Sequence, residues 1–236
     1  MKLFNFDPQD YSAAYAQHGF VHIRQGLTDQ FYQVLRAQVD EYLHTRRLEK
    51  FALGDKQQSL YQFPQQWDCF GQLLDGVADV CGLDRTALIL SERHIKAYDL
   101  NANPRPLAHK DRYGSEVSVG FSVSVPQASK LVLYPYDDVS VNPYDSSAEL
   151  RASLAPEAVP EVTLKHARRV ELSDTAGDVV MFRGNAIWHL RSHPAGTTML
   201  YLKLNTFNSD PLGEDPRHEF GASESLEFAA ADHSAM

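Results

Sequence analysis

Hydrophobic residues in the first third of the chain recur with the period of an α-helix. Asp7-Pro8 is a typical helix start and Gly19 a typical helix end, which predicts a first helix between them. Thr28 can cap a second helix, and Gly82 can end a third, each with its apolar residues on one face. A short alternating stretch at 20–24 predicts a strand between the first two helices. We therefore expect residues 1–86 to be mostly helical.

From about residue 87 the period of the hydrophobic pattern changes to two. The clearest case is 117–125, where valines and Phe121 alternate with serines and Gly120. Its small polar face suits a strand that lines a cavity, because bulky side chains there would fill the space. Further strands are predicted at 87–98, 131–134, 162–164, 168–172, 179–182, 187–191 and 197–207.

The order of these elements predicts a fold of the α+β class. Helices come first and many short strands follow, which favours a double-stranded β-helix (a jelly-roll, cupin-like core) buttressed by N-terminal helices. We expect one domain over 1–236, with a helical part at about 1–86, the jelly-roll core at about 87–208 and an irregular tail at about 209–236. The insertion at 136–160, with a short helix near 148–154, has the length of a functional lid.

Charge and composition exclude several classes of partner. The formal net charge is −9 over 236 residues, which argues against binding to nucleic acid or to an anionic membrane surface. No apolar stretch approaches the length of a membrane-spanning helix, and the start of the chain lacks the apolar core of a secretory signal. The two cysteines, Cys69 and Cys81, have no metal-ligand spacing. We expect a cytoplasmic protein that acts on a small molecule.

Two motifs far apart in the chain together suggest a metal site. In His109-Lys110-Asp111, residues two apart on an extended segment point to the same side, and His189 follows a predicted turn and strand. Two histidines and one carboxylate form the facial triad that binds Fe(II) and leaves coordination positions open. Taken alone, His-x-Asp is a weak signal, because so short a motif occurs by chance and His109 also fits a surface loop. His94 and His193 are better explained as structural or substrate-facing residues.

The sequence also resembles the phytanoyl-CoA hydroxylase-like (PhyH) family of Fe(II)/2-oxoglutarate dioxygenases. The resemblance covers roughly residues 10–207, and it rests on the opening Gly19-Phe20-Val21…Leu27-Thr28, on His109-x-Asp111 and on Gly177-Asp178…His189. It implies a double-stranded β-helix core, iron held by His109, Asp111 and His189, 2-oxoglutarate as cosubstrate and O₂ as oxidant. Because Asp111 is present, the resemblance implies hydroxylation or another oxidative step in preference to halogenation.

The cosubstrate site departs from the family pattern. The arginine that the family usually places on the strand after the distal histidine, against the far carboxylate of 2-oxoglutarate, falls here on Leu200. The candidate replacements for that arginine, and a threonine that could add a hydrogen bond, are Lys203, Lys96, Arg191 and Thr198. A lysine can neutralise a carboxylate but lacks the bidentate fork of arginine.

We expect the enzyme to oxidise an unactivated C–H bond of a small molecule, for example an amino acid or a natural-product intermediate. The candidate substrate contacts are Tyr98, Arg112, Tyr113 and Trp188. Asp137 and Asp138 in the insertion fit either a cationic substrate or a solvated lid. Two alternatives remain: a non-catalytic binding protein with a degenerate jelly-roll site, favoured by the missing arginine, and an iron oxygenase that does not use 2-oxoglutarate.

Overall fold

The computed structural model describes residues 1–45, 49–51 and 55–218, with 49–51 described by its backbone alone. The helices are α1 (Gln9–His18), α2 (Asp29–Thr45), α3 (Cys69–Cys81), α4 (Ser147–Ser153) and α5 (Pro160–Thr163). The strands are β1 (Phe20–Ile23), β2 (Glu49–Phe51), β3 (Lys56–Leu60), β4 (Ile89–Tyr98), β5 (Val117–Ser124), β6 (Lys130–Tyr134), β7 (Val170–Leu172), β8 (Val179–Phe182), β9 (Trp188–Ser192) and β10 (Thr198–Asn205).

The strands form two antiparallel sheets. The larger has the order β1-β8-β5-β10-β4-β3-β2 and the smaller has the order β7-β6-β9. The sequence order of the strands differs from their spatial order, so neighbours such as β5 and β10 come from distant parts of the chain. This is the predicted α+β fold, with a jelly-roll core and N-terminal helices.

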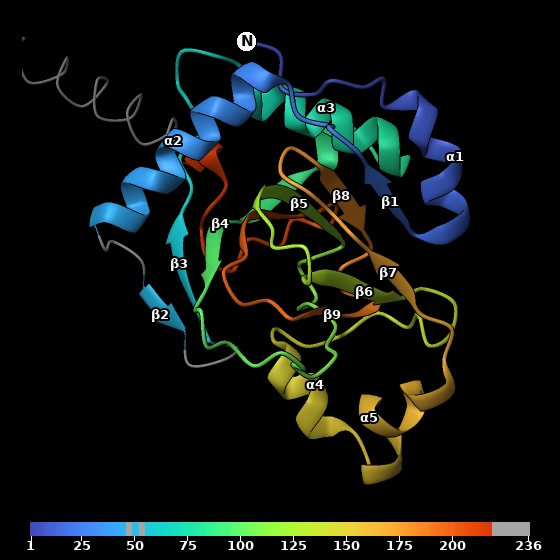
Figure 1. The fold of residues 1–236 in the computed structure, drawn as a ribbon. Coiled ribbons are helices and arrows are strands. Elements are labelled where there is room, and N and C mark those ends of the chain that lie inside the picture. Colours follow the sequence, from blue (N-terminus) through green and yellow to red (C-terminus); the bar gives the residue numbers. More distant parts are fainter. Residues whose placement is uncertain (46–48, 52–54, 219–236) are drawn as a thin grey trace, which may run out of the picture.

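The N-terminal helices end and begin where the sequence predicts. Gly19 and Gly82 both have positive φ, at 74° and 66°, and close the ends of α1 and α3. The hydroxyl of Thr28 accepts a hydrogen bond from the Phe31 amide at 3.3 Å, and the Asp68 carboxylate caps α3 by accepting from the Gly71 amide at 2.9 Å. Figure 1 shows α2 and α3 on one side of the larger sheet, and α4 and α5 at the opposite end of the molecule.

The main hydrophobic core lies between these helices and the larger sheet. On β10, Leu200, Leu202 and Leu204 pack into this core. Because side chains alternate along a strand, Tyr201 and Lys203 point the other way, into the space between the two sheets. The same alternation sends His189 and Arg191 of β9 into that space. The side chains that point away from the hydrophobic core therefore line a polar interior between the two sheets, which we call the barrel interior.

Parts of the predicted organisation need correction. Residues 162–164 are not a strand: Pro160 starts α5, and a 3-10 turn, Leu164–His166, follows. The N-terminal part also contains β2 and β3, which the hydrophobic pattern missed and which extend the larger sheet beyond β4. Residues 209–218 are held against β4, since the side chains of Glu214 and Asp215 accept hydrogen bonds from its amides. The remainder of the predicted tail, 219–236, lies outside the described residues. None of the described helices has the length and apolar character needed to cross a membrane.

Candidate metal centre

The structure brings the three predicted metal ligands together. His109 and His189 form an isolated β-bridge, in which each amide donates to the other residue's carbonyl at 2.9 and 2.8 Å. The Asp111 amide donates to the carbonyl of Gly184 at 2.9 Å, in the turn between β8 and β9. One potential ligand atom from each side chain lies within 4.8 Å of the other two. These backbone hydrogen bonds therefore hold the segment that carries His109 and Asp111 against the segment that carries His189.

The ring nitrogens are arranged for metal binding. In His189, Nδ1 lies 2.9 Å from the carbonyl of Ile187, so it carries the proton and donates it. This leaves the lone pair on Nε2, which lies 3.8 Å from Oδ1 of Asp111. The Nε2 atom of His109 lies 4.0 Å from the same oxygen. Two imidazole nitrogens and one carboxylate oxygen thus face a common point.

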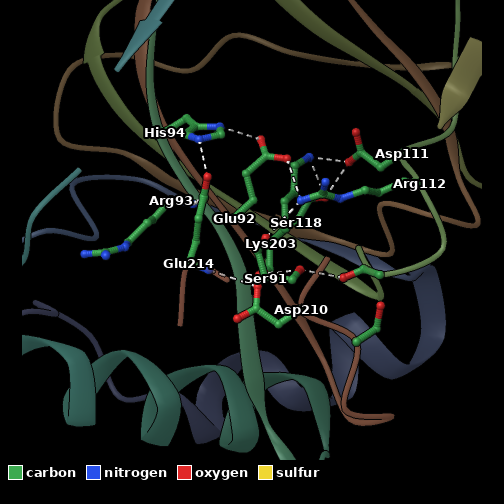
Figure 2. A network of polar contacts seen from close by, with 12 residues as sticks. Ser91, Glu92, Arg93, His94, Asp111, Arg112, Ser118, Lys203, Asp210 and Glu214 are labelled. Carbon is green, nitrogen blue, oxygen red and sulfur yellow. Dashed lines mark hydrogen bonds and ion pairs between the residues drawn. The ribbon is translucent and has the colours of Figure 1, made fainter. Parts of the chain in front are cut away.

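The second oxygen of Asp111 is held by the protein. Ser118 donates to Oδ2 at 2.6 Å, Lys203 Nζ contacts the same oxygen, and Lys203 also donates to the Ser118 hydroxyl at 2.9 Å. Figure 2 shows Lys203 and Ser118 beside Asp111. A Cβ atom added at Gly184 would lie 2.7 Å from Oδ2 and 1.9 Å from the Ser118 hydroxyl. Only a glycine therefore leaves room for the carboxylate in this orientation.

The electrostatics keep all three ligands in the form that binds a cation. Burial alone would raise the pKa of Asp111, but Lys203, His189 and His109 outweigh it and hold that pKa well below its ordinary value. Burial lowers the pKa of His109, and His189 lowers it further. Burial also lowers the pKa of His189 in spite of the opposing charge of Asp111. At neutral pH the site therefore offers one carboxylate and two neutral imidazoles.

The four residues predicted to bind the cosubstrate lie in different surroundings. Lys203 is occupied by Asp111, and Lys96 lies 2.6 Å from Glu92. Arg191 forms two hydrogen bonds with Asp174, at 2.9 and 3.0 Å, in a pair that is almost fully buried. Thr198 is buried at the start of β10, paired with Ala97 and Ser124.

The residues predicted to contact substrate also lie in different surroundings. Tyr98 ends β4 on the interior face, and Arg112 donates to the Ser91 carbonyl at 2.9 Å and lies 3.2 Å from Glu92. Tyr113 is 40% exposed and lies against the ring of Phe207.

Trp188 does not reach the metal centre. It precedes His189 on β9 and so faces the other way, into a cluster with Leu150 and Leu164. Its indole N–H donates to Asp138 at 2.9 Å, and Asp138 also binds the buried Lys110 at 3.1 Å. This acid therefore has a structural role, while Asp137 is exposed.

Several residues of the site were missed by the sequence analysis. Glu92 is a buried carboxylate that contacts Lys96. It also contacts Arg112 and His94, as Figure 2 shows. Lys56, on β3, lies beside Tyr98 with its Nζ 5.5 Å from the ring centroid. Glu92 could have been found from the alternation of β4, whereas Lys56 carries no local signal, because its strand was not predicted.

The fold is similar to those of solved Fe(II)- and 2-oxoglutarate-dependent oxygenases. The α-ketoglutarate-dependent carbocyclase SnoK from nogalamycin biosynthesis matches with a TM-score of 0.58 and 16% identity, over 85% of this chain and 83% of SnoK. A Pseudomonas putida prolyl-4-hydroxylase matches with a TM-score of 0.56 and 15% identity, over 84% and 97%. HygX from Streptomyces hygroscopicus, solved with nickel, 2-oxoglutarate and hygromycin B, gives 0.57 and 12%, over 85% and 87%.

At these identities the likeness establishes the fold. No protein-family model and no curated protein matches the sequence. The chain thus combines the fold of the Fe(II)/2-oxoglutarate oxygenases with a His-x-Asp…His group.

Proposed function

We propose that this protein is an Fe(II)- and 2-oxoglutarate-dependent dioxygenase that hydroxylates or otherwise oxidises an unactivated C–H bond of a small molecule. The observation that carries the proposal is the convergence of His109, Asp111 and His189 in the interior of an oxygenase fold. Two neutral imidazoles and one carboxylate fit a divalent iron ion, and the second atoms of His189 and Asp111 are already held by the protein. When bound, the iron would supply the activation of O₂ through its open coordination positions.

The chain's own residues would hold and orient the reactants. Ser118 and Lys203 fix the Asp111 carboxylate so that Oδ1 is presented to the metal. Phe182 packs its ring at 4.7 Å from the ring of His189 and helps to exclude water from that side. Arg112 directly follows Asp111, and its guanidinium lies 3.2 Å from the Glu92 carboxylate, where it could contact a substrate.

We also propose a family, a location and a domain organisation for the protein. Membership of the PhyH-like family, a cytoplasmic location and a single domain over 1–236 are supported by the sequence patterns described above. A small-molecule substrate is also supported by HygX, which was solved with hygromycin B bound. An amino acid or a natural-product intermediate fits an interior that is lined by both acids and bases.

The absence of the family's arginine, at the position of Leu200, is also compatible with a second function. A binding protein without catalytic activity would also tolerate Leu200, which packs in the hydrophobic core and cannot contact a ligand in the barrel. The two functions differ in turnover. A catalytic site should convert 2-oxoglutarate to succinate slowly even without substrate, because the cosubstrate reaction can run uncoupled.

The test is succinate formation with Fe(II), 2-oxoglutarate and O₂, in the natural protein and in Asp111→Ala. We expect slow succinate formation that Asp111→Ala abolishes, with an unchanged far-UV circular dichroism spectrum. The exposed Asp137→Ala variant is the matched control and should keep the activity. Equal succinate formation by Asp111→Ala would contradict the ligand assignment, and no succinate from the natural protein would favour the binding protein.

A further inference from the structure

Among the described charged side chains between the two sheets, one lysine has no carboxylate partner. Three interior cations each have a carboxylate partner: Lys203 with Asp111, Lys96 with Glu92 at 2.6 Å, and Arg191 with Asp174 at 2.9 Å. A fourth, Arg112, shares Glu92 at 3.2 Å. Among the described residues, Lys56 is the interior cation that has no carboxylate within ion-pair distance. A partly buried cation without a partner is unfavourable, so this position is suited to an external anion.

Lys56 lies close to the candidate metal centre. In the β3–β4 ladder it pairs directly with Tyr98, and Gln58 pairs with Lys96. Its ammonium group is near enough to the metal ligands that its charge contributes to the low pKa of His109. Burial, and then the neighbouring charge of Lys96, lower the pKa of Lys56 to about 8. Two cations therefore sit side by side in the interior, with Glu92 already engaged by one of them.

The neighbouring tyrosines complete a polar cradle. The Nζ atom of Lys56 lies 5.5 Å from the ring centroid of Tyr98, and that of Lys96 lies 5.7 Å from the ring centroid of Tyr201. Burial raises the pKa of both phenols, so each hydroxyl remains neutral and able to donate a hydrogen bond. Two ammonium groups and two phenols are donors that match the oxygens of a carboxylate.

We infer that Lys56, Lys96 and Tyr98 form a carboxylate-binding site beside the metal centre. The bound carboxylate accepts hydrogen bonds from Lys56 and Tyr98 and reduces the repulsion between the two lysines. Two molecules could supply it: 2-oxoglutarate, through its far carboxylate, or an anionic substrate. Only the identity of the ligand rests on the proposed function, since the cradle exists without metal. The site would take over the role that the family assigns to the arginine replaced by Leu200.

The first experiment measures binding without any metal. Glutarate, a dicarboxylate that has no keto group, is titrated into the metal-free protein by isothermal titration calorimetry. We expect Lys56→Gln to weaken glutarate binding roughly ten- to hundredfold, the effect of one charge-assisted hydrogen bond. Lys56→Arg keeps the charge and should retain most of the affinity, while the exposed Lys165→Gln is the matched control. Unchanged affinity in Lys56→Gln, with a natural circular dichroism spectrum, would overturn the site.

The second experiment identifies the source of the carboxylate. 2-Oxoglutarate is compared with 2-oxopentanoate, in which a methyl group replaces the far carboxylate, by anaerobic titration of the Fe(II)-loaded protein. If Lys56→Gln loses the preference for 2-oxoglutarate, the site binds the cosubstrate. If the preference persists but glutarate no longer binds to the cosubstrate-loaded protein, the site binds an anionic substrate. If Lys56→Gln keeps both the preference for 2-oxoglutarate and the binding of glutarate to the cosubstrate-loaded protein, the proposal is overturned. Failure of both oxo acids to bind iron would contradict the proposed function alone, because the metal-free titration decides the site separately.

Discussion

Asp174 should be among the residues whose loss destabilises the protein most. Its side chain is 0% exposed, and that of its partner Arg191 is 2% exposed. Asp174→Ala would leave the Arg191 guanidinium buried without its carboxylate and would also remove the acceptor of the Ser122 hydroxyl at 2.8 Å. Breaking such a buried pair costs about 3–5 kcal/mol of the free energy of unfolding. For a chain of this size that is a fall of roughly 6–20 °C in Tm.

The assay is urea unfolding followed by circular dichroism, with thermal melts alongside. The double variant Arg191→Met/Asp174→Leu removes both charges, so we expect it to lose much less stability than the sum of the two single variants. The exposed Asp137→Ala is the control and should change stability by less than about 0.5 kcal/mol. A cost below about 1 kcal/mol for Asp174→Ala would contradict this expectation, because that is the contribution of a solvent-exposed ion pair and not of a buried one.

Three further substitutions test the metal site, the His94 contacts and the packing of Trp188. Gly184→Ala places a methyl group 2.7 Å from the Asp111 carboxylate, so we expect metal affinity, measured by competition with a chelating dye, to fall roughly 10–100-fold; unchanged affinity would show that the turn can move. Burial disfavours the His94 cation, but the hydrogen bond that His94 donates to Glu214 and the neighbouring Glu92 carboxylate outweigh it and raise its pKa. The stabilisation by protonated His94 is present below the unfolded pKa of about 6.5 and is lost as pH rises through the folded pKa. Glu214→Gln should therefore destabilise the protein more in acid than in base. An equal loss of stability at all pH values would contradict this. Trp188→Ala should lower the free energy of unfolding by about 3–5 kcal/mol, and normal stability would contradict its place in the cluster under α4.

Most helices, most strands and the metal triad could be predicted because each has a local signal. Gly19 and Gly82 mark helix ends by their backbone conformation, and the alternation of β5 is visible in its residues. The triad needed only the same-side rule for His109 and Asp111 and one distant histidine. These features depend on chemistry that acts over a few residues.

The rest depended on packing that no short window of sequence contains. β3, with the sequence Lys-Gln-Gln-Ser-Leu, has hardly any apolar pattern and forms a strand because β4 offers it a free edge. Lys56 was missed for that reason. A register shift in the β4–β10 ladder, between Lys203 and Leu204, sends Leu90 into the core, against simple alternation along β4.

Tertiary contacts that the sequence does not reveal bear on two of the predicted roles. The sequence predicts that Lys203 binds the cosubstrate, because it lies on the strand after His189. In the structure Lys203 contacts Asp111 and Ser118, an arrangement that depends on three segments meeting. Trp188 is adjacent to a metal ligand in the sequence but lies on the opposite face of β9. Short sequence motifs therefore predicted the ligands better than they predicted the residues around them.

The proposed function depends on His109, Asp111 and His189 holding one ferrous ion that 2-oxoglutarate can chelate. Anaerobic titration of the protein with Fe(II) and then 2-oxoglutarate, followed by visible absorption, examines this without any substrate. We expect a weak charge-transfer band that saturates with one equivalent of iron and is absent in His189→Ala. Iron that binds without the band would contradict the role of 2-oxoglutarate, and a band of equal strength in His189→Ala would contradict the site itself.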